Sequence, residues 1–141
     1  MNNVELFVLP QSLLEKLVAH ALCVAPKESV SIISGIIQNN KVIAEKVYSP
    51  KNTDNSTISF TVDPLELLEI YLEIEKEEKY LIGIYHTHPA PPVPSGIDVQ
   101  YMEVNPYIWL ISSMSKPEKP KGYLLLENKQ LKEIKIEILE Q

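Results

Sequence analysis

The chain has 141 residues, of which 45% are hydrophobic and 23% charged, so it is expected to fold around a single core. Its net charge is -6, and no long basic run marks a nucleic-acid-binding surface. The single cysteine, Cys23, excludes an intrachain disulfide, and no apolar run approaches the roughly 20 residues that cross a membrane. Because the chain starts without a basic, apolar leader, a cytoplasmic protein is expected.

The first 50 residues predict strands at 6–9, 30–37 and 42–48, with one helix after the first strand. Ser12-Leu-Leu-Glu15 matches a capping box at the start of that helix, and Pro26 would end it. Asn39 lies in the turn between the second and third strands, where asparagine tolerates the left-handed conformation of a tight hairpin. Cys23, on the helix, is expected to be a small buried side chain.

The rest of the chain predicts strands at 57–62, 80–85, 107–112, 123–126 and 131–139. Asp63-Pro64 would cap a second main helix, and a short helix would span residues 96–104. The residues of the second helix expected to face inward are Leu67, Leu68, Tyr71, Leu72 and Ile74. The fold predicted from these elements is a single α/β domain over residues 1–141, with a curved, largely antiparallel sheet packed by two main helices and the short helix.

The stretch from Gly83 to Asp98 contains the residues that suggest chemistry. Side chains alternate along a strand, so His86 and His88 would point to the same face and could reach one ion. A proline-rich loop would bring the chain back so that Asp98 can supply a third ligand. Two histidines and a carboxylate leave one tetrahedral position open for water, which is the arrangement of catalytic zinc sites.

Each part of this pattern also has a plainer interpretation. A His-x-His pair is often only a pair of polar residues at a strand end, and Ser95-x-x-Asp98 is an ordinary helix-capping pattern, although a capping serine can serve both roles. Glu28 could be the base that a metal-activated water needs, but composition alone favours an exposed residue in a turn after Pro26. Trp109 is expected in the core or at a sheet edge. Only the combination favours a catalytic metal site.

Glu28, His86-Thr-His88-Pro and Ser95-x-x-Asp98 together resemble the JAMM motif of the MPN+ metallopeptidases. Gly35, Asn52 and the stretch from Phe60 to Pro64 are supporting matches. The chain departs from the family pattern in two places. The loop between His88 and Ser95 is one residue shorter than is common, and Ser29-Val30-Ser31 stands where many relatives have a cysteine followed by a glycine.

The resemblance implies the MPN fold, which is similar to that of cytidine deaminases, and one zinc ion bound by His86, His88 and Asp98. It also implies that Glu28 holds and deprotonates the attacking water, and that Ser95 donates a hydrogen bond to the oxyanion. These roles agree with the chemistry that a bound zinc ion and a placed donor supply.

Relatives of this kind cut the isopeptide bond between the diglycine tail of a ubiquitin-like modifier and a lysine, and some small prokaryotic members process sulfur-carrier proteins. The resemblance therefore implies a desampylase- or deubiquitinase-like isopeptidase of a small prokaryotic, archaeal type. A strand edge beside the metal would let the tail pair with the enzyme backbone. The alternatives are a non-catalytic MPN scaffold module and a metal hydrolase with a non-protein substrate. No nucleic-acid or membrane partner is expected, and a homodimer is compatible with the sequence.

Overall fold

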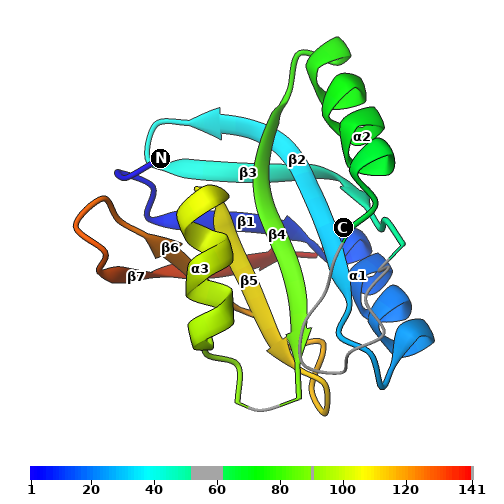
Figure 1. The fold of residues 1–141 in the computed structure, drawn as a ribbon. Helices are drawn as coiled ribbons and strands as arrows, with labels where there is room; N and C mark the ends of the chain where they lie inside the picture. The colour runs from blue at the N-terminus through cyan, green and yellow to red at the C-terminus, as the bar shows by residue number, and fades with distance from the viewer. Residues whose placement is uncertain (52–61, 90, 141) are drawn as a thin grey trace.

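The computed structural model describes residues 1–51, 62–89 and 91–140. Its seven strands form a closed barrel in the spatial order β1-β3-β2-β4-β5-β6-β7 (Figure 1). The strands are β1 (Leu6–Pro10), β2 (Val30–Gln38), β3 (Lys41–Tyr48), β4 (Tyr80–His88), β5 (Ile108–Ser113), β6 (Lys121–Leu125) and β7 (Leu131–Leu139). The helices are α1 (Gln11–Val24), α2 (Pro64–Lys76) and α3 (Gly96–Val104).

The barrel is more mixed than the predicted, largely antiparallel sheet. Four of its seven strand pairs are antiparallel, and the pairs β1–β3, β1–β7 and β4–β5 are parallel. Strand β1 closes the barrel because it pairs with both β3 and β7. Each described strand therefore has a neighbour on both sides along at least part of its length. The ladder between β2 and β4 ends at Val30 opposite His86, so the pairing of a tail with a strand edge beside the site stays a prediction.

Local signals account for two of the observed turns and helix ends and fail at a third. Asp63 accepts a hydrogen bond from the Leu65 amide at 3.0 Å and caps α2, as predicted. Asn39 adopts the left-handed conformation (φ 55°) in the two-residue turn between β2 and β3. The capping box predicted at Ser12 is wrong, because α1 already begins at Gln11 and its N-cap residue is Pro10, which makes no side-chain cap.

Helices pack on both faces of the barrel wall. The apolar side of α1, with Leu13, Leu14 and Leu17, lies in the main core together with Phe7 and Tyr85. Two smaller clusters cover the opposite face, one under α3 and one under α2. Figure 1 shows α2 and α3 on either side of the central strands β2 and β4. The central strands are thus largely buried on both faces.

Several burial predictions are wrong. Leu68 and Leu72 of α2 are 51% and 56% exposed, because only Ile70 and Ile74 of this helix are fully buried against the barrel. Cys23 is exposed as well. The strand predicted at 57–62 and the family matches at Asn52 and Phe60 lie largely outside the described residues. Among the described residues, no helix is long and apolar enough to cross a membrane.

Candidate active site

Strand β4 brings His86 and His88 to one face of the barrel wall. The two rings lie edge to face with their centroids 6.0 Å apart, as the alternation of side chains along a strand predicts. His86 is fully buried and the side chain of His88 is 13% exposed. One histidine therefore lies in the floor of the site, and the other lies where the site opens towards solvent.

Glu28 lies just before β2 and is directed into the same site. Val30 is opposite His86 in the antiparallel pair β2–β4, so a side chain two residues before Val30 lies on the same face as His86. The Glu28 side chain is only 1% exposed, and its Oε1 lies 2.7 Å from Nε2 of His86. The interpretation of Glu28 as an exposed turn residue is therefore wrong.

Helix α3 supplies the second carboxylate through its first turn. Ser95 and Asp98 form a complete capping box, in which the Asp98 amide donates to Ser95 Oγ at 3.1 Å and the Ser95 amide donates to Asp98 Oδ2 at 2.9 Å. The other oxygen, Oδ1, lies 3.2 Å from Nε2 of His86. The cap thus fixes the orientation of the carboxylate, and the two predicted roles of the Ser95–Asp98 pattern are compatible.

The two carboxylates change the electrostatics of His86. Burial lowers the pKa of its imidazole, but contacts with Asp98 and Glu28 outweigh burial and raise the pKa from 6.5 to about 9. Burial raises the pKa of Asp98, and the hydrogen bond and charge of His86 reverse this effect, so that the pKa of the carboxyl lies below its usual value. The two carboxyl groups thus favour the protonated form of His86 when no metal is bound.

The donor set suits a zinc ion. Tetrahedral zinc with bonds of about 2.0–2.1 Å holds its ligand atoms about 3.3 Å apart. His86 Nε2 lies 3.2 Å from Asp98 Oδ1, and His88 Nε2 lies 3.8 Å from Asp98 Oδ2. Among the described residues, however, no three His, Cys, Asp or Glu side chains converge as preformed ligands. Since Nε2 of His86 lies against Glu28, a metal on this atom has to replace that contact.

Comparison with known families identifies the domain. The family model of prokaryotic homologs of the JAB domain matches residues 10–123, a range that includes Glu28, both histidines of the motif, Ser95 and Asp98. The chain belongs to this JAB family. The resemblance to the MPN+ metallopeptidases and the predicted α/β fold are thereby confirmed, and membership of this family implies dependence on a metal.

Two curated relatives and one solved structure are similar to this JAB-family chain. The desampylase of Pyrococcus furiosus is 34% identical over 92% of the chain and 88% of its own length. The probable TtuB-protein conjugate cleaving protease of Thermus thermophilus is 36% identical over 64% of the chain and 60% of its own length. The solution structure of protein DSY2949 from Desulfitobacterium hafniense superimposes with a TM-score of 0.82 at 29% identity, covering 96% of this chain and 94% of that one.

Three residues around the site, Ser29, Thr87 and Trp109, were given no role in it from the sequence. Ser29 accepts a hydrogen bond on its carbonyl oxygen from Nδ1 of His86, at 3.2 Å, and also contacts Thr87. Trp109 is fully buried, as predicted, and its ring packs edge to face against His86 with centroids 6.5 Å apart. The position of Thr87 could have been predicted from the alternation of side chains along a strand. Thr87 lies between two histidines that face the site, so its own side chain has to lie on the opposite face.

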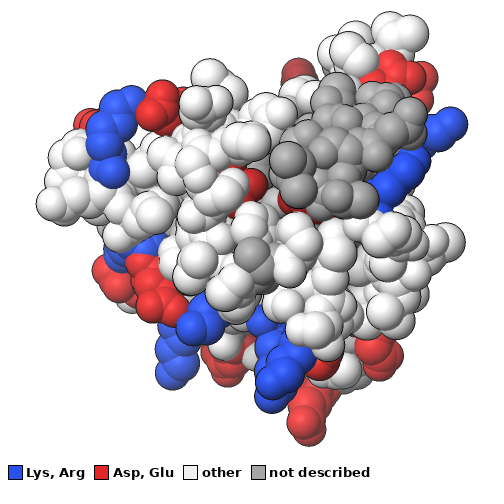
Figure 2. Space-filling view, turned by 60° about the horizontal axis from the view of Figure 1, so that its bottom comes forward, with Lys and Arg blue, Asp and Glu red and all other residues white. Residues whose placement is uncertain are grey.

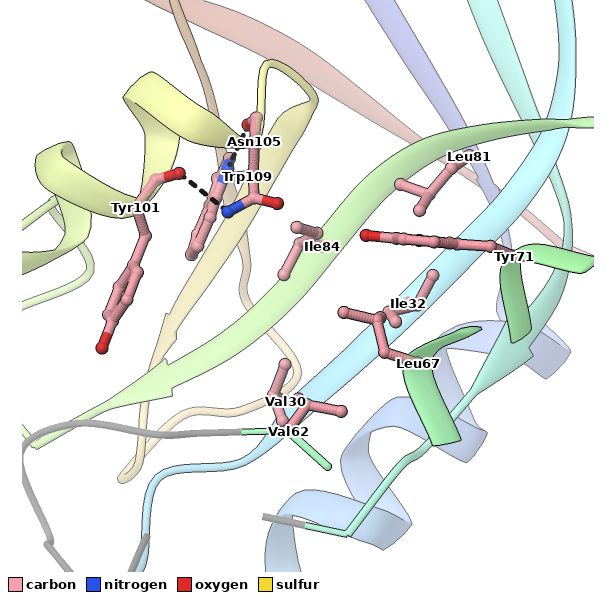
Figure 3. A pocket seen from close by; sticks show the side chains of 10 residues that line it. All are labelled: Val30, Ile32, Val62, Leu67, Tyr71, Leu81, Ile84, Tyr101, Asn105 and Trp109. Atoms are coloured by element: carbon pink, nitrogen blue, oxygen red, sulfur yellow. Dashed lines mark hydrogen bonds between the residues drawn. The ribbon is translucent and has the colours of Figure 1, made fainter. Parts of the chain in front are cut away.

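An apolar pocket of about 320 Å³ lies beside the JAB-family site, between α2 and α3. Figure 3 shows Leu67 and Tyr71 of α2 on one side of it and Trp109 on the other, with Ile84 between them. Trp109 lines this pocket and also packs against His86, so the pocket lies next to the site. On the face seen in Figure 2, lysine and acidic side chains lie mostly near the margin, and the described residues form no extended basic surface there.

Proposed function

We propose that this protein is a zinc-dependent isopeptidase that hydrolyses the amide bond after the C-terminal diglycine tail of a ubiquitin-like modifier. The observation that supports this most strongly is that Glu28 and Asp98 place carboxylate oxygens 2.7 and 3.2 Å from one nitrogen of the buried His86. Three buried ionisable groups at one point are costly to a fold and are typical of functional sites. In this proposal His86, His88 and Asp98 bind one zinc ion.

The remaining residues would carry out the proton transfers and bind the oxyanion. Zinc, when bound, would lower the pKa of a water molecule and polarise the substrate carbonyl. Glu28 accepts a proton from the attacking water and delivers it to the lysine amine as the C–N bond breaks. Ser95 Oγ already accepts a hydrogen bond from the Asp98 amide, so its hydroxyl hydrogen is available to the oxyanion of the tetrahedral intermediate.

The class of substrate is supported by the relatives and by the shape of the site. Both curated relatives carry names that describe cleavage of modifier conjugates. His86 is fully buried beside Trp109, so a chain that reaches it needs residues without side chains, which a diglycine tail provides. The apolar pocket would then hold an apolar side chain of the tail upstream of the glycines.

Cleavage of a defined conjugate tests this proposal. The zinc-loaded protein is incubated with a modifier linked through its diglycine tail to a lysine, with and without a chelator. We expect cleavage after the second glycine, its loss with chelator and its recovery with zinc. Glu28→Ala should retain zinc and lose cleavage, whereas Glu69→Ala, an exposed carboxylate on α2, should retain both. Full activity of Glu28→Ala would show that another group is the base.

A non-catalytic scaffold is the alternative from another class. Such a module would need neither the metal ligands nor Glu28, yet all of the motif residues are retained in this chain. Metal analysis separates the two proposals. One zinc ion per folded chain that is lost in His88→Ala supports the enzyme, and a folded protein that binds no zinc would support the scaffold.

A further inference from the structure

Ser29 and Thr87 form a buried pair behind the proposed site, on the opposite face of the barrel wall. Their side chains are 0% and 2% exposed. The Ser29 amide donates to Thr87 Oγ1 at 2.8 Å, and the two hydroxyl oxygens lie 2.9 Å apart. Both hydrogen bonds are shielded from water, so each holds its groups more firmly than an exposed bond would.

This pair replaces the regular strand pairing at the point where β2 begins. The ladder between β2 and β4 ends at Val30 opposite His86. One residue further, the Ser29 amide is bonded to a side chain, and the remaining backbone bond, from the Thr87 amide to the Ser29 carbonyl, is long at 3.4 Å. The Thr87 hydroxyl therefore accepts the shortest hydrogen bond between Ser29, the residue that precedes β2, and the strand that carries the histidines.

Ser29 transmits this connection to two groups of the site. It is the residue next to Glu28, so its backbone sets the direction in which the Glu28 side chain leaves the chain. Its carbonyl oxygen also contacts Nδ1 of His86 at 3.2 Å, which orients the ring so that Nε2 faces Glu28 and Asp98. A displacement of Ser29 would move the base and rotate the histidine together.

We infer that Thr87 is a positioning residue, whose hydroxyl, through Ser29, holds the Glu28 carboxylate in register with His86. The inference rests on the proposed function only where it concerns catalysis. Thr87 is on the far side of the strand from the site and does not touch the substrate. Its substitution should therefore change turnover more than binding.

Three variants separate the hydroxyl from the packing of its side chain. Thr87→Val keeps the shape and removes both hydrogen bonds, Thr87→Ser keeps the hydroxyl, and Ser29→Ala keeps only the bond from the amide. We expect kcat to fall about 10- to 100-fold in Thr87→Val, with KM changed by less than about twofold, because a small misplacement of a catalytic group has effects of this size. Ser29→Ala should lie between Thr87→Val and Thr87→Ser, and Thr87→Ser should be close to the unchanged protein.

Two measurements without turnover test the same placement. In the metal-free protein, Thr87→Val should increase the rate of hydrogen exchange of the Ser29 amide by about tenfold or more, since that amide loses its acceptor. The imidazole signals of His86 in NMR spectra at fixed pH should shift in Thr87→Val and not in Thr87→Ser. Zinc content should stay at one ion per chain, and urea unfolding should show that each variant is folded under the assay conditions.

The outcomes distinguish this inference from the proposed function. If the unchanged protein does not cleave the conjugate, the proposed function fails, and the exchange and NMR measurements alone decide whether Thr87 holds Ser29 and His86 in place. If Thr87→Val is folded and leaves kcat, Ser29 exchange and the His86 signals unchanged, the inference is overturned. It is also overturned if Thr87→Ser is as impaired as Thr87→Val, because the hydroxyl would then not be the group that matters.

Discussion

The contacts around His86 predict that the metal-free protein loses stability at alkaline pH. Burial lowers the pKa of His86, but Asp98 and Glu28 raise it overall from 6.5 to about 9. Because the pKa in the folded state is the higher one, the protonated ring stabilises the fold fully below pH 6.5, and this contribution is lost as the pH rises through 9. One pKa unit corresponds to about 1.4 kcal/mol, so the loss in free energy of unfolding approaches about 3 kcal/mol.

Urea denaturation in the presence of a chelator measures this loss, over a series from about pH 5.5 to about 9.5. We expect the midpoint to fall across the alkaline part of the series. In the zinc-loaded protein the metal takes the place of the proton, so the fall should be much smaller. His86→Gln should also remove it, and His20→Gln should leave it intact, because burial alone lowers the pKa of His20 and no carboxylate raises it.

On the acidic side the sign is opposite. The pKa of Asp98 lies below its ordinary value of 3.8, so its contribution is present above that value and is lost as the pH falls through the lower, folded-state pKa. The metal-free protein should thus be most stable between pH 3.8 and 6.5 as far as this pair is concerned. A metal-free profile that stays flat from pH 6.5 to 9, or an alkaline loss that persists in His86→Gln, would refute the reasoning.

Three further substitutions test separate parts of the structure. Ser95→Ala should lower kcat by about 10²- to 10³-fold in steady-state assays, because the donor to the oxyanion is lost. It should also lower the free energy of unfolding in urea by about 1 kcal/mol, because the cap of α3 is lost. An unchanged kcat would exclude the oxyanion role. Gly35→Ala should lower the melting temperature through a loss of about 1–3 kcal/mol, since a Cβ would fall on the carbonyl oxygen of Ile43. The register between β2 and β3 shifts at Ser34 and Gly35, and an unchanged melting temperature would mean that this irregular point adjusts to the new side chain. Leu67→Gln, in the apolar pocket, should raise KM for the conjugate with little change in kcat; if only kcat falls, the pocket does not bind the tail.

Local patterns in the sequence predicted much of the site. Strand parity placed His86 and His88 on one face, and the Ser-x-x-Asp pattern predicted a cap that the structure contains. These features depend on neighbours within a few residues, where backbone geometry is the main constraint. The same reasoning located the caps of α2 and α3 to the residue.

Features that depend on distant partners were not predictable in the same way. The environment of Glu28 is set by His86, 58 residues further along the chain, so composition suggested an exposed turn where the structure has a buried carboxylate. The parallel pairing of β1 with β7, which closes the barrel, joins the two ends of the sequence and leaves no periodic signal. Likewise, the apolar pattern of α2 did not show which of its residues contact the barrel, so Leu68 and Leu72 were predicted to face inward although they are exposed and Ile70 is buried.

The carboxylate of Asp98 connects two equilibria, because one of its oxygens accepts the Ser95 amide and the other faces His86. Folding of the first turn of α3 and occupation of the proposed metal site are therefore thermodynamically linked, and the linkage is reciprocal. If a bound metal stabilises the folded first turn of α3 by a certain factor, the folded turn raises the affinity for the metal by the same factor. By the same linkage, a bound substrate that holds the first turn of α3 in place would raise the affinity for the metal. The affinity would fall again when the substrate leaves.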